Sequence, residues 1–538
     1  MFIGGGMMKL LDAFSLQKNS TNGDIKIPNY DREIIKQNTK NNPEWIHFGA
    51  GNIFRSFIAA DVDKMIEKKV YDKGIIVCED FDKELIDLAY SPYDNISLLV
   101  TLKSNGSIDK QVIGSVVEST TEYERYKELF RKKSLQIVSF TITEKGYAIK
   151  NASGEILPVV QSDMEEKSDI PKHLMSKITA LCYERYLCGK SPLALVSMDN
   201  CSNNGDKLKA SIIFIAEEWV KRGYCEQEFI EYLNDSNKIA FPCSMIDKIT
   251  PRPDALVKEM LEKDGFVDTG VIITSKNTYT APFVNAEETE YLVIEDKFPN
   301  GRPALEQAGF YMTDRKTVDD CERMKVCTCL NPIHTALAIF GCLLGYKSIH
   351  EEMENDTLRT LVTKMGIKEG MPVVINPGIL DPKEFIQNVL EVRLPNPFMP
   401  DTPQRIATDT SQKLSIRFGN TIEAYIKSDS LNVSDLKIIP FVIAGWLRYL
   451  LGVDDRGNAF ELSSDPMLEE LQSLMKSIKF KDQTVDKTVL EPILRNKVIF
   501  HVDLVECGLS DCIISYFMEM IKQEGAILNL MKSIIVEY

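Results

Sequence analysis

From residue 45 onward the sequence alternates short apolar runs with longer amphipathic segments, and this alternation constrains the fold more than any other feature. The apolar runs have strand length: WIHFG (45–49), GIIVCED (74–80), LQIVSFTITE (135–144), LALVSMDN (193–200) and GVIITS (270–275). In the segment 52–69, between the first two runs, apolar residues recur with a helical period. Strand, helix and strand at this spacing predict βαβ units. Their repetition predicts a mostly parallel sheet covered by helices on both faces.

The first strand ends in Gly49-Ala50-Gly51-Asn52-Ile53-Phe54-Arg55, just where a helix is predicted to begin. In a dinucleotide site, Gly49 would permit a tight turn and Gly51 would let the backbone approach a pyrophosphate at the helix N-terminus. The third glycine of the usual GxGxxG motif is replaced by Phe54. A plain structural turn is the alternative interpretation of GxG taken alone, but its place between strand and helix favours nucleotide binding.

Acidic residues follow the second strand at Glu79, Asp80 and Asp82. A carboxylate here would accept hydrogen bonds from the adenosine ribose and repel the extra phosphate of NADP, so NAD is the favoured cofactor. Glu79 and Asp80 are the better candidates. The alternative is that these acids cap the following helix.

Helical patterns dominate after about residue 312, whereas residues 1–42 form a polar N-terminal arm. The segments 96–104 and 107–118 predict an antiparallel insertion, and the proline-rich segment 394–403 predicts an ordered loop. Helices are expected in segments 333–346, 436–453, 467–478 and 512–523. We therefore predict an α/β Rossmann-like NAD-binding domain over 43–312 and a mainly α-helical substrate and catalytic domain over 313–538.

Charge and cysteine usage narrow the functional classes. Lys and Arg total 63 against 79 Asp and Glu, a net charge of −16, which argues against nucleic acid or an anionic membrane as the main partner. A local group of Arg and Lys can still reverse the sign at a ligand site. No apolar run reaches 18 residues, and the N-terminus does not have the pattern of a signal peptide. The 12 scattered cysteines and five dispersed histidines predict a cytoplasmic protein without a metal site.

Polar residues stand where the predicted strands end and where a later helix begins. They are Thr143 and Glu144 in TITEKGY, Asn200 in VSMDN, Asp247 in MIDKITPRPD, and Lys325, Asn331 and His334 in KVCTCLNPIH. Ligands of open parallel sheets bind beyond the carboxyl ends of strands. Asn331-Pro332 predicts a helix N-cap, with Lys325 on the segment leading into the helix. The alternatives are that Asn331 only caps, that His334 is a core histidine, and that Lys325 is a surface charge.

Seven ordered stretches between residues 45 and 420 resemble the polyol-specific long-chain dehydrogenases, the family of mannitol 2-dehydrogenase, fructuronate reductase and tagaturonate reductase. They are HFGAGNIFR (47–55), TITEKGY (141–147), SMDNCSNNGD (197–206), MIDKITPRPD (245–254), YLVIED (291–296), KVCTCLNPIHTALAIFG (325–341) and RLPNP (393–397). The resemblance implies metal-independent oxidation of a CH–OH group with NAD.

The resemblance also implies roles for individual residues. Lys325 matches the catalytic base, Asn331 and Asn200 match the asparagines that polarise the reacting oxygen, and His334 matches the histidine that orients the substrate. Asp247 and Arg393 match substrate-pocket positions. The family usually places the lysine five residues before the asparagine, whereas the interval here is six. A loop or bulge could absorb the extra residue.

The substrate is expected to be a ketose or keto-uronate, foremost D-fructuronate reduced to D-mannonate, because the sequence is nearer the uronate branch of the family. Mannitol 2-dehydrogenase and tagaturonate reductase activities are alternatives within the family. Further alternatives are a sugar-phosphate dehydrogenase and an NAD-binding module without catalysis. A uronate requires a cation for its carboxylate, and Arg393, Arg252 and Arg417 are available.

Overall fold

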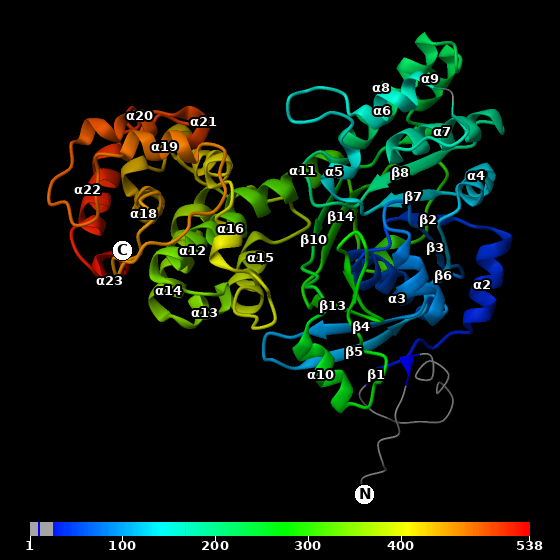
Figure 1. Ribbon diagram of the computed structural model, residues 1–538, viewed down its shortest axis with the longest axis horizontal. Helices are drawn as coiled ribbons and strands as arrows, with labels where there is room; N and C mark the ends of the chain where they lie inside the picture. The colour runs from blue at the N-terminus through cyan, green and yellow to red at the C-terminus, as the bar shows by residue number, and fades with distance from the viewer. Residues whose placement is uncertain (1–8, 11–24, 167) are drawn as a thin grey trace, which may run out of the picture. The chain divides into compact units, whose positions relative to one another are not determined.

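The computed structural model describes residues 9, 10, 25–166 and 168–538 of the chain. The chain divides into two compact units, Met1–Asp319 and Asp320–Tyr538 (Figure 1). The first unit contains the strands, and the second is helical among its described residues.

The main sheet of the first unit is parallel throughout. In the described residues its strand order is β6-β3-β2-β7-β8-β9. The strands are Trp45–Phe48 (β2), Ile75–Cys78 (β3), Val116–Thr120 (β6), Ile137–Phe140 (β7), Leu193–Ser197 (β8) and Ile239–Ala240 (β9). Counted along the chain, this is the order 3-2-1-4-5-6 of the Rossmann fold, and the order reverses between β2 and β7. The predicted parallel α/β architecture is confirmed.

Both faces of this sheet are buried, and successive side chains alternate between two cores. Trp45, Ile75 and Ile137 face one core, whereas Ile46, Ile76 and Val138 face the other. Helices Phe54–Ala59 (η2), Ala60–Glu67 (α3) and Ile86–Tyr90 (η3) cover the first face. The second face is covered by Tyr123–Arg131 (α4), Pro158–Glu165 (α6), Leu174–Leu187 (α7), Asn204–Lys221 (α8) and Gln227–Asn234 (α9). Burial on two faces explains why the strands read as continuous apolar runs.

Three smaller sheets complete the first unit in its described residues. One joins Ile25–Lys26 (β1), Ile108–Ile113 (β5), Ser97–Leu102 (β4) and Phe283–Glu287 (β13). Another joins Ser244–Asp247 (β10), Tyr291–Glu295 (β14) and Tyr311–Thr313 (β15), and a third pairs Ile272–Ile273 (β11) with Tyr279–Thr280 (β12). Ala255–Lys263 (α10) follows β10.

Two strand predictions were wrong in detail. The antiparallel pair β4–β5 is confirmed, but the end of the segment assigned to that insertion is β6, an edge strand of the parallel sheet. The run 270–275 contributes only β11 to a short hairpin and does not join the parallel sheet. Short apolar runs do not specify their partner strands, because pairing is decided by packing distant in sequence.

Residues 25–42, at the end of the expected N-terminal arm, are built into the first unit. They form β1 and the helix Arg32–Asn41 (α2), whose Ile35 lies in the core. Arg32 is buried and donates hydrogen bonds to the carbonyls of Gly114 and Val116. Residues 1–8 and 11–24 of the expected arm lie outside the described residues.

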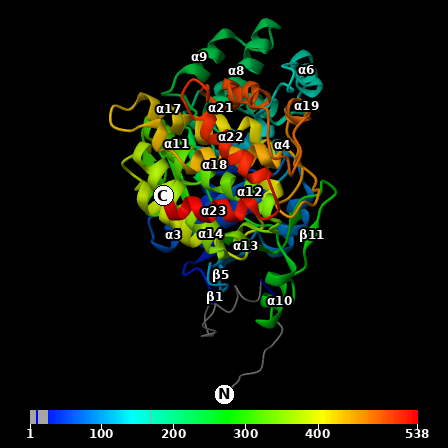
Figure 2. The same cartoon turned by 90° about the vertical axis from the view of Figure 1, so that its left-hand side faces the viewer.

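The second unit is organised around two apolar helices, Asn331–Leu344 (α12) and Ile438–Tyr449 (α18). They pack against each other and are flanked by Asp356–Lys364 (α14), Ser510–Ile521 (α22) and Ala526–Glu537 (α23) (Figure 2). Shorter helices are Ile349–Glu354 (α13), Pro382–Asn388 (α15), Pro403–Ile406 (α16), Asn420–Lys427 (α17), Leu468–Met475 (α19), Glu491–Leu494 (α20) and Lys497–Phe500 (α21). The four helices expected from the sequence and the loop before residue 403 are confirmed.

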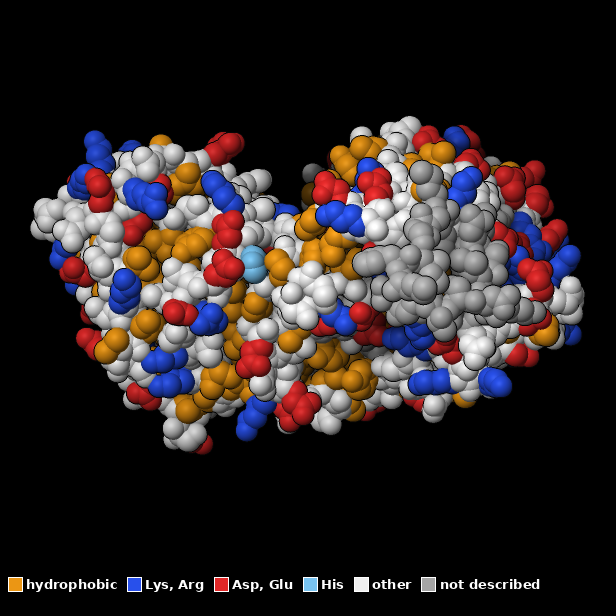
Figure 3. Space-filling view, turned by 90° about the horizontal axis from the view of Figure 1, so that it is seen from below, with side chains coloured by type: hydrophobic (Ala, Val, Ile, Leu, Met, Phe, Trp, Pro, Cys, Tyr) orange, Lys and Arg blue, Asp and Glu red, His pale blue; other side chains and the backbone are white. Residues whose placement is uncertain are grey.

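The segment Arg315–Leu344, comprising Arg315–Met324 (α11), Lys325–Cys329 (η6) and α12, is long and apolar enough to cross a membrane by length and composition. However, 72% of its apolar window is buried inside the protein. The cysteines, all twelve of them within the described residues, are free thiols. On the face in Figure 3, acidic and basic side chains are interspersed rather than separated by sign.

Candidate active site

The turn after β2 lies at the point where the strand order reverses. Gly49 has φ +111°, and a Cβ there would lie 2.2 Å from the carbonyl oxygen of Thr141, which follows β7. Its amide donates to the carbonyl of Cys78 at the end of β3. Gly49 is therefore required for the chain to turn between two neighbouring strand ends.

Gly51 differs, because a Cβ at Gly51 would meet no atom within 4 Å. Internal packing therefore does not explain this glycine, and the open space fits the close approach of a pyrophosphate. The neighbouring Asn52 accepts a hydrogen bond from Arg55 at 2.9 Å, and its amide donates to the carbonyl of Tyr279.

Arg55 and Phe54 lie behind the turn instead of facing a ligand. Arg55 is fully buried and donates to the carbonyl of Ala281 and the hydroxyl of Thr280, and burial lowers its pKa. Phe54 is fully buried and stacks on His47, with ring centroids 4.1 Å apart. We therefore correct their assignment: both pack behind the turn. Phe54 fills the space where a third glycine would allow closer helix–strand packing.

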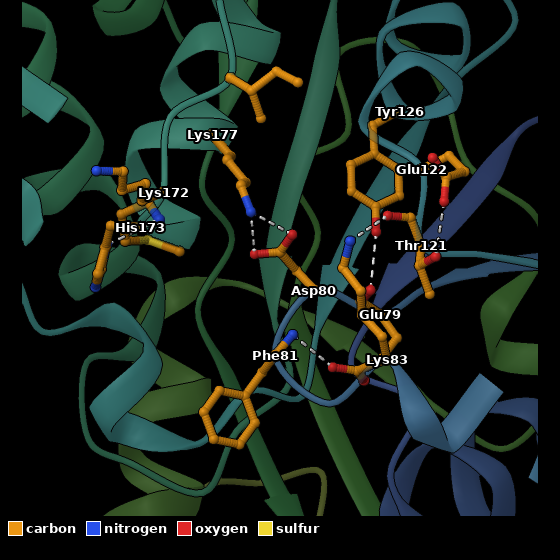
Figure 4. A network of polar contacts seen from close by, with 12 residues as sticks. Glu79, Asp80, Phe81, Lys83, Thr121, Glu122, Tyr126, Lys172, His173 and Lys177 are labelled. Carbon is orange, nitrogen blue, oxygen red and sulfur yellow. Dashed lines mark hydrogen bonds and ion pairs between the residues drawn. The ribbon is translucent and has the colours of Figure 1, made fainter. Parts of the chain in front are cut away.

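Of Glu79 and Asp80, the two acids proposed for the ribose, Glu79 binds backbone amides. Its carboxylate accepts hydrogen bonds from the amides of Ala50, Phe81 and Asp82 at 2.7–2.9 Å. Figure 4 shows the bond from Phe81. Burial raises the pKa of Glu79, whereas these three amides act in the opposite direction. Glu79 thus joins the glycine turn to the loop after β3, and we reassign it from ribose binding to support of that turn.

Asp80 is the acid that remains for a ribose. It is partly buried and forms a two-pronged ion pair with Lys177 of α7 at 2.6 and 2.7 Å (Figure 4). Lys177 comes from a helix nearly a hundred residues away, and the sequence carried no signal for it. The lysine fixes the orientation of the carboxylate next to the predicted ribose position.

Residues after β7 and β8 are held together by Asp199. Its carboxylate accepts from the amides of Ile142 and Thr143 at 2.9 Å and from the Tyr147 hydroxyl at 2.6 Å. Thr143 has a positive φ and begins the short helix Thr143–Tyr147 (α5), while Glu144 is exposed and pairs with Lys207. This arrangement places Asn200, an exposed residue, directly after the residue that links the two strand ends.

Asp247 is the last residue of β10 and is buried. It lies opposite Tyr291 in the β10–β14 ladder. The sequence pattern predicts Asp247 at the end of a strand, and the residue lies at the end of β10.

Lys325 is buried in a helix, so its interpretation as a surface charge is excluded. The residue is 3% exposed. The helix α11 precedes it, which corrects the expectation that Lys325 stands ahead of the helix. Lys325 begins η6, a π-helical turn in which the amide of Leu330 donates to the Lys325 carbonyl at 3.0 Å. A π-turn holds one residue more than an α-turn, so it absorbs the extra residue between Lys325 and Asn331.

Asn331 is the first residue inside α12 and Leu330 is the N-cap residue, so the N-cap prediction for Asn331 was wrong by one position. Its carbonyl accepts from the hydroxyl of Thr335 at 2.9 Å. His334 lies one turn on, with Nε2 3.3 Å from a carboxylate oxygen of Asp401. That distance does not give a hydrogen bond, since Nε2 is buried without a partner of acceptable geometry.

The surroundings of His334 are cationic. Burial and the positive charges of Arg417, Arg405, Arg393 and Lys413 lower its pKa to about 3, so the imidazole is neutral near pH 7. Arg393 ends the π-helical segment Val389–Arg393 (η9) and is 2% exposed. The sequence had proposed Arg393 for the substrate pocket, whereas Lys413, Arg405 and Asp401 were missed because nothing local marks them.

Both halves of the chain match family models. Residues 43–307 match the mannitol dehydrogenase Rossmann domain, and residues 317–513 match the mannitol dehydrogenase C-terminal domain. D-mannonate oxidoreductase of Thermotoga maritima is 50% identical over 95% of this chain and 96% of its own length. The chain belongs to the mannitol dehydrogenase family. The expected family and enzyme class, a dehydrogenase, are thereby confirmed.

Other members of the mannitol dehydrogenase family are more distant. Mannitol 2-dehydrogenase of Emericella nidulans is 29% identical, covering 85% of this chain and 87% of its own. A D-sorbitol dehydrogenase crystal structure matches with a TM-score of 0.78 at 25% identity, covering 94% of this chain and 97% of its own. The structure of mannitol 2-dehydrogenase of Pseudomonas fluorescens, solved with NAD and D-mannitol, matches with a TM-score of 0.67 at 24% identity. The match covers 96% of this chain and 98% of that one.

In the described residues of this mannitol dehydrogenase family member, no group of three His, Cys, Asp or Glu side chains could hold a metal ion. The residues expected at the site carry an amine (Lys325), carboxamides (Asn200 and Asn331) and a neutral imidazole (His334). These can exchange a proton and donate hydrogen bonds to an oxygen that develops negative charge.

Proposed function

We propose that this chain is an NAD-dependent, metal-independent dehydrogenase that interconverts D-fructuronate and D-mannonate in the cytoplasm. The main support is the 50% identity to D-mannonate oxidoreductase across 95% of the chain. Fungal mannitol 2-dehydrogenases are only 28–30% identical to this chain, so they support a neutral polyol substrate less well.

NAD fits the first unit, because the strand order, the Gly49 turn and the space beside Gly51 are those of a dinucleotide site. Asp80 would accept hydrogen bonds from the ribose hydroxyls. When bound, the cofactor accepts or returns the hydride of the substrate carbon.

The chain's own residues would handle the proton and the charge. In the oxidative direction, neutral Lys325 takes the proton of the substrate hydroxyl. Asn331 and Asn200 donate hydrogen bonds to the developing alkoxide, and neutral His334 orients the substrate. Burial of Lys325 fits this role, because removal from water favours the uncharged amine that a base requires.

The test is Lys325→Ala, assayed by NADH oxidation with D-fructuronate. We expect the turnover number to fall by about 1,000-fold or more while NADH binding, followed by fluorescence, stays within about threefold. Lys347→Ala, at an exposed position after α12, is the matched control and should behave as the parent enzyme. Near-normal turnover of Lys325→Ala would contradict the proposal.

A further inference from the structure

Four cationic side chains gather around His334 in a protein whose net charge is −16. They come from separate segments: Arg393 from η9, Arg405 from α16, and Lys413 and Arg417 from the region of Ser415–Gly419 (η11). We call these four residues the cationic cluster. A concentration of one charge sign against the overall balance requires a local explanation.

Two members of the cationic cluster form no ion pair with any carboxylate that the structure describes. Arg405 pairs with Asp401, and Arg393 has polar partners of its own. Among the described residues Arg417 forms no ion pair, and its hydrogen bond goes to the Thr335 hydroxyl. Lys413 likewise forms no ion pair in this part of the chain, and it donates to the carbonyl of Thr408.

This arrangement is costly for the protein alone. Burial lowers the pKa of Arg417 to about 10. Burial and the charge of Arg417 also lower the pKa of Lys413, although the negative charges of Asp409 and Asp465 act in the opposite direction. A buried cation without an ion-pair partner among the described residues, as Arg417 is, destabilises a fold, and a bound anion would offset that cost. Both side chains remain partly exposed, so a ligand can reach them.

Arg417 is also connected to the proposed catalytic helix. η11 packs against η6 and α12. Arg417 donates to Thr335, and Thr335 in turn donates to the carbonyl of Asn331. The Arg417 guanidinium is therefore linked through the Thr335 side chain to Asn331, which is expected to bind the reacting oxygen.

We infer that Arg417, assisted by Lys413, binds the carboxylate of a sugar-acid substrate. The inference rests on the proposed function and names the group that distinguishes a uronate from a neutral ketose. A guanidinium presents paired N–H donors that match the two oxygens of a carboxylate, which no hydroxyl of a neutral sugar reproduces.

The experiment compares Arg417→Met with the parent enzyme on D-fructuronate and on D-fructose, which lacks the carboxylate. We expect KM for fructuronate to rise at least 50-fold in Arg417→Met, with kcat/KM for fructose within threefold. The KM of Arg417→Lys for fructuronate should lie between the values of the parent enzyme and Arg417→Met. D-gluconate, a carboxylate without the ketone, should lose competitive inhibition in Arg417→Met. The control is Arg359→Met, an exposed arginine of α14 paired with Asp356.

Thermal unfolding separates binding from a structural role. If Arg417 is retained for a ligand, Arg417→Met should keep or raise the Tm. A lower Tm with equal losses on both substrates would overturn the inference, as would an unchanged KM for fructuronate. If instead no keto-uronate supports NADH oxidation by the parent enzyme, the proposed function itself fails.

Discussion

At the residue scale, the two glycines of the turn after β2 occupy their positions for different physical reasons. Gly49 has a positive φ and no room for a Cβ, whereas Gly51 borders open space. Folding explains the first glycine, whereas packing does not explain the second, which fits the proposed pyrophosphate site. Substitution by alanine separates the two roles.

We expect Gly49→Ala to destabilise the first unit by about 3 kcal/mol, because alanine at positive φ is strained and its Cβ overlaps the Thr141 carbonyl. Gly51→Ala should keep the parent Tm and weaken NADH binding by about tenfold or more. Thermal unfolding and fluorescence titration measure both. Equal NADH affinity in Gly51→Ala would contradict pyrophosphate binding at this turn.

The Asp80–Lys177 ion pair leads to a prediction about cofactor choice. Asp80→Asn frees Lys177 to interact with the extra phosphate of NADPH. In Asp80→Asn we expect kcat/KM with NADH to fall about tenfold. We also expect the ratio of kcat/KM for NADH to kcat/KM for NADPH to decrease. The double variant with Lys177→Met should lose the NADPH gain. If the two variants have the same NADPH kinetics, Lys177 has no part in cofactor choice.

At the element scale, the π-turn η6 reconciles this chain with the spacing of its family. Because a π-turn and an α-turn differ by one residue, deleting Val326 should convert η6 into an α-turn and keep Lys325 in register with Asn331. We expect the deletion variant to fold and to retain at least about a tenth of the parent turnover. Inserting an alanine after Val326 is the matched change and should abolish turnover. Loss of activity in both variants would show that the turn does not work as a spacer.

At the scale of the whole molecule, each unit contains a buried neutral histidine. Burial lowers the pKa of His47 in the first unit to about 3, and His334 in the second unit has a similar value. The unfolded chain binds protons at these sites below about pH 6.5, and the folded chain does not. Stability from these residues is therefore complete above pH 6.5 and is lost as the pH falls towards 3.

We expect each histidine to lower the unfolding free energy of its unit by about 2 kcal/mol between pH 7.5 and pH 5. Urea unfolding at the two pH values measures this. His47→Gln and His334→Gln should each flatten the pH dependence of one unit. Profiles of both variants that run parallel to that of the parent would contradict the assignment.

Much of the fold followed from local pattern. The apolar runs ending at Phe48, Cys78, Phe140 and Ser197 are strands because both faces of a parallel sheet are buried, and this burial is visible in sequence. The run at 116–120 was misplaced, because its partner strand lies some forty residues away. Periodicity records which face of an element is buried, but not which element covers it.

The sequence by itself determined the α/β plan, the glycine turn and the family, because these depend on residues that are neighbours in the chain. Only the tertiary structure decided that Glu79 supports the turn while Asp80 is paired with Lys177. It also decided that Arg417 lies near His334 without an ion-pair partner among the described residues. The physical reason is that charge pairing, burial and pKa depend on distances in space. Folding brings together groups whose separation in sequence carries no record of their contact.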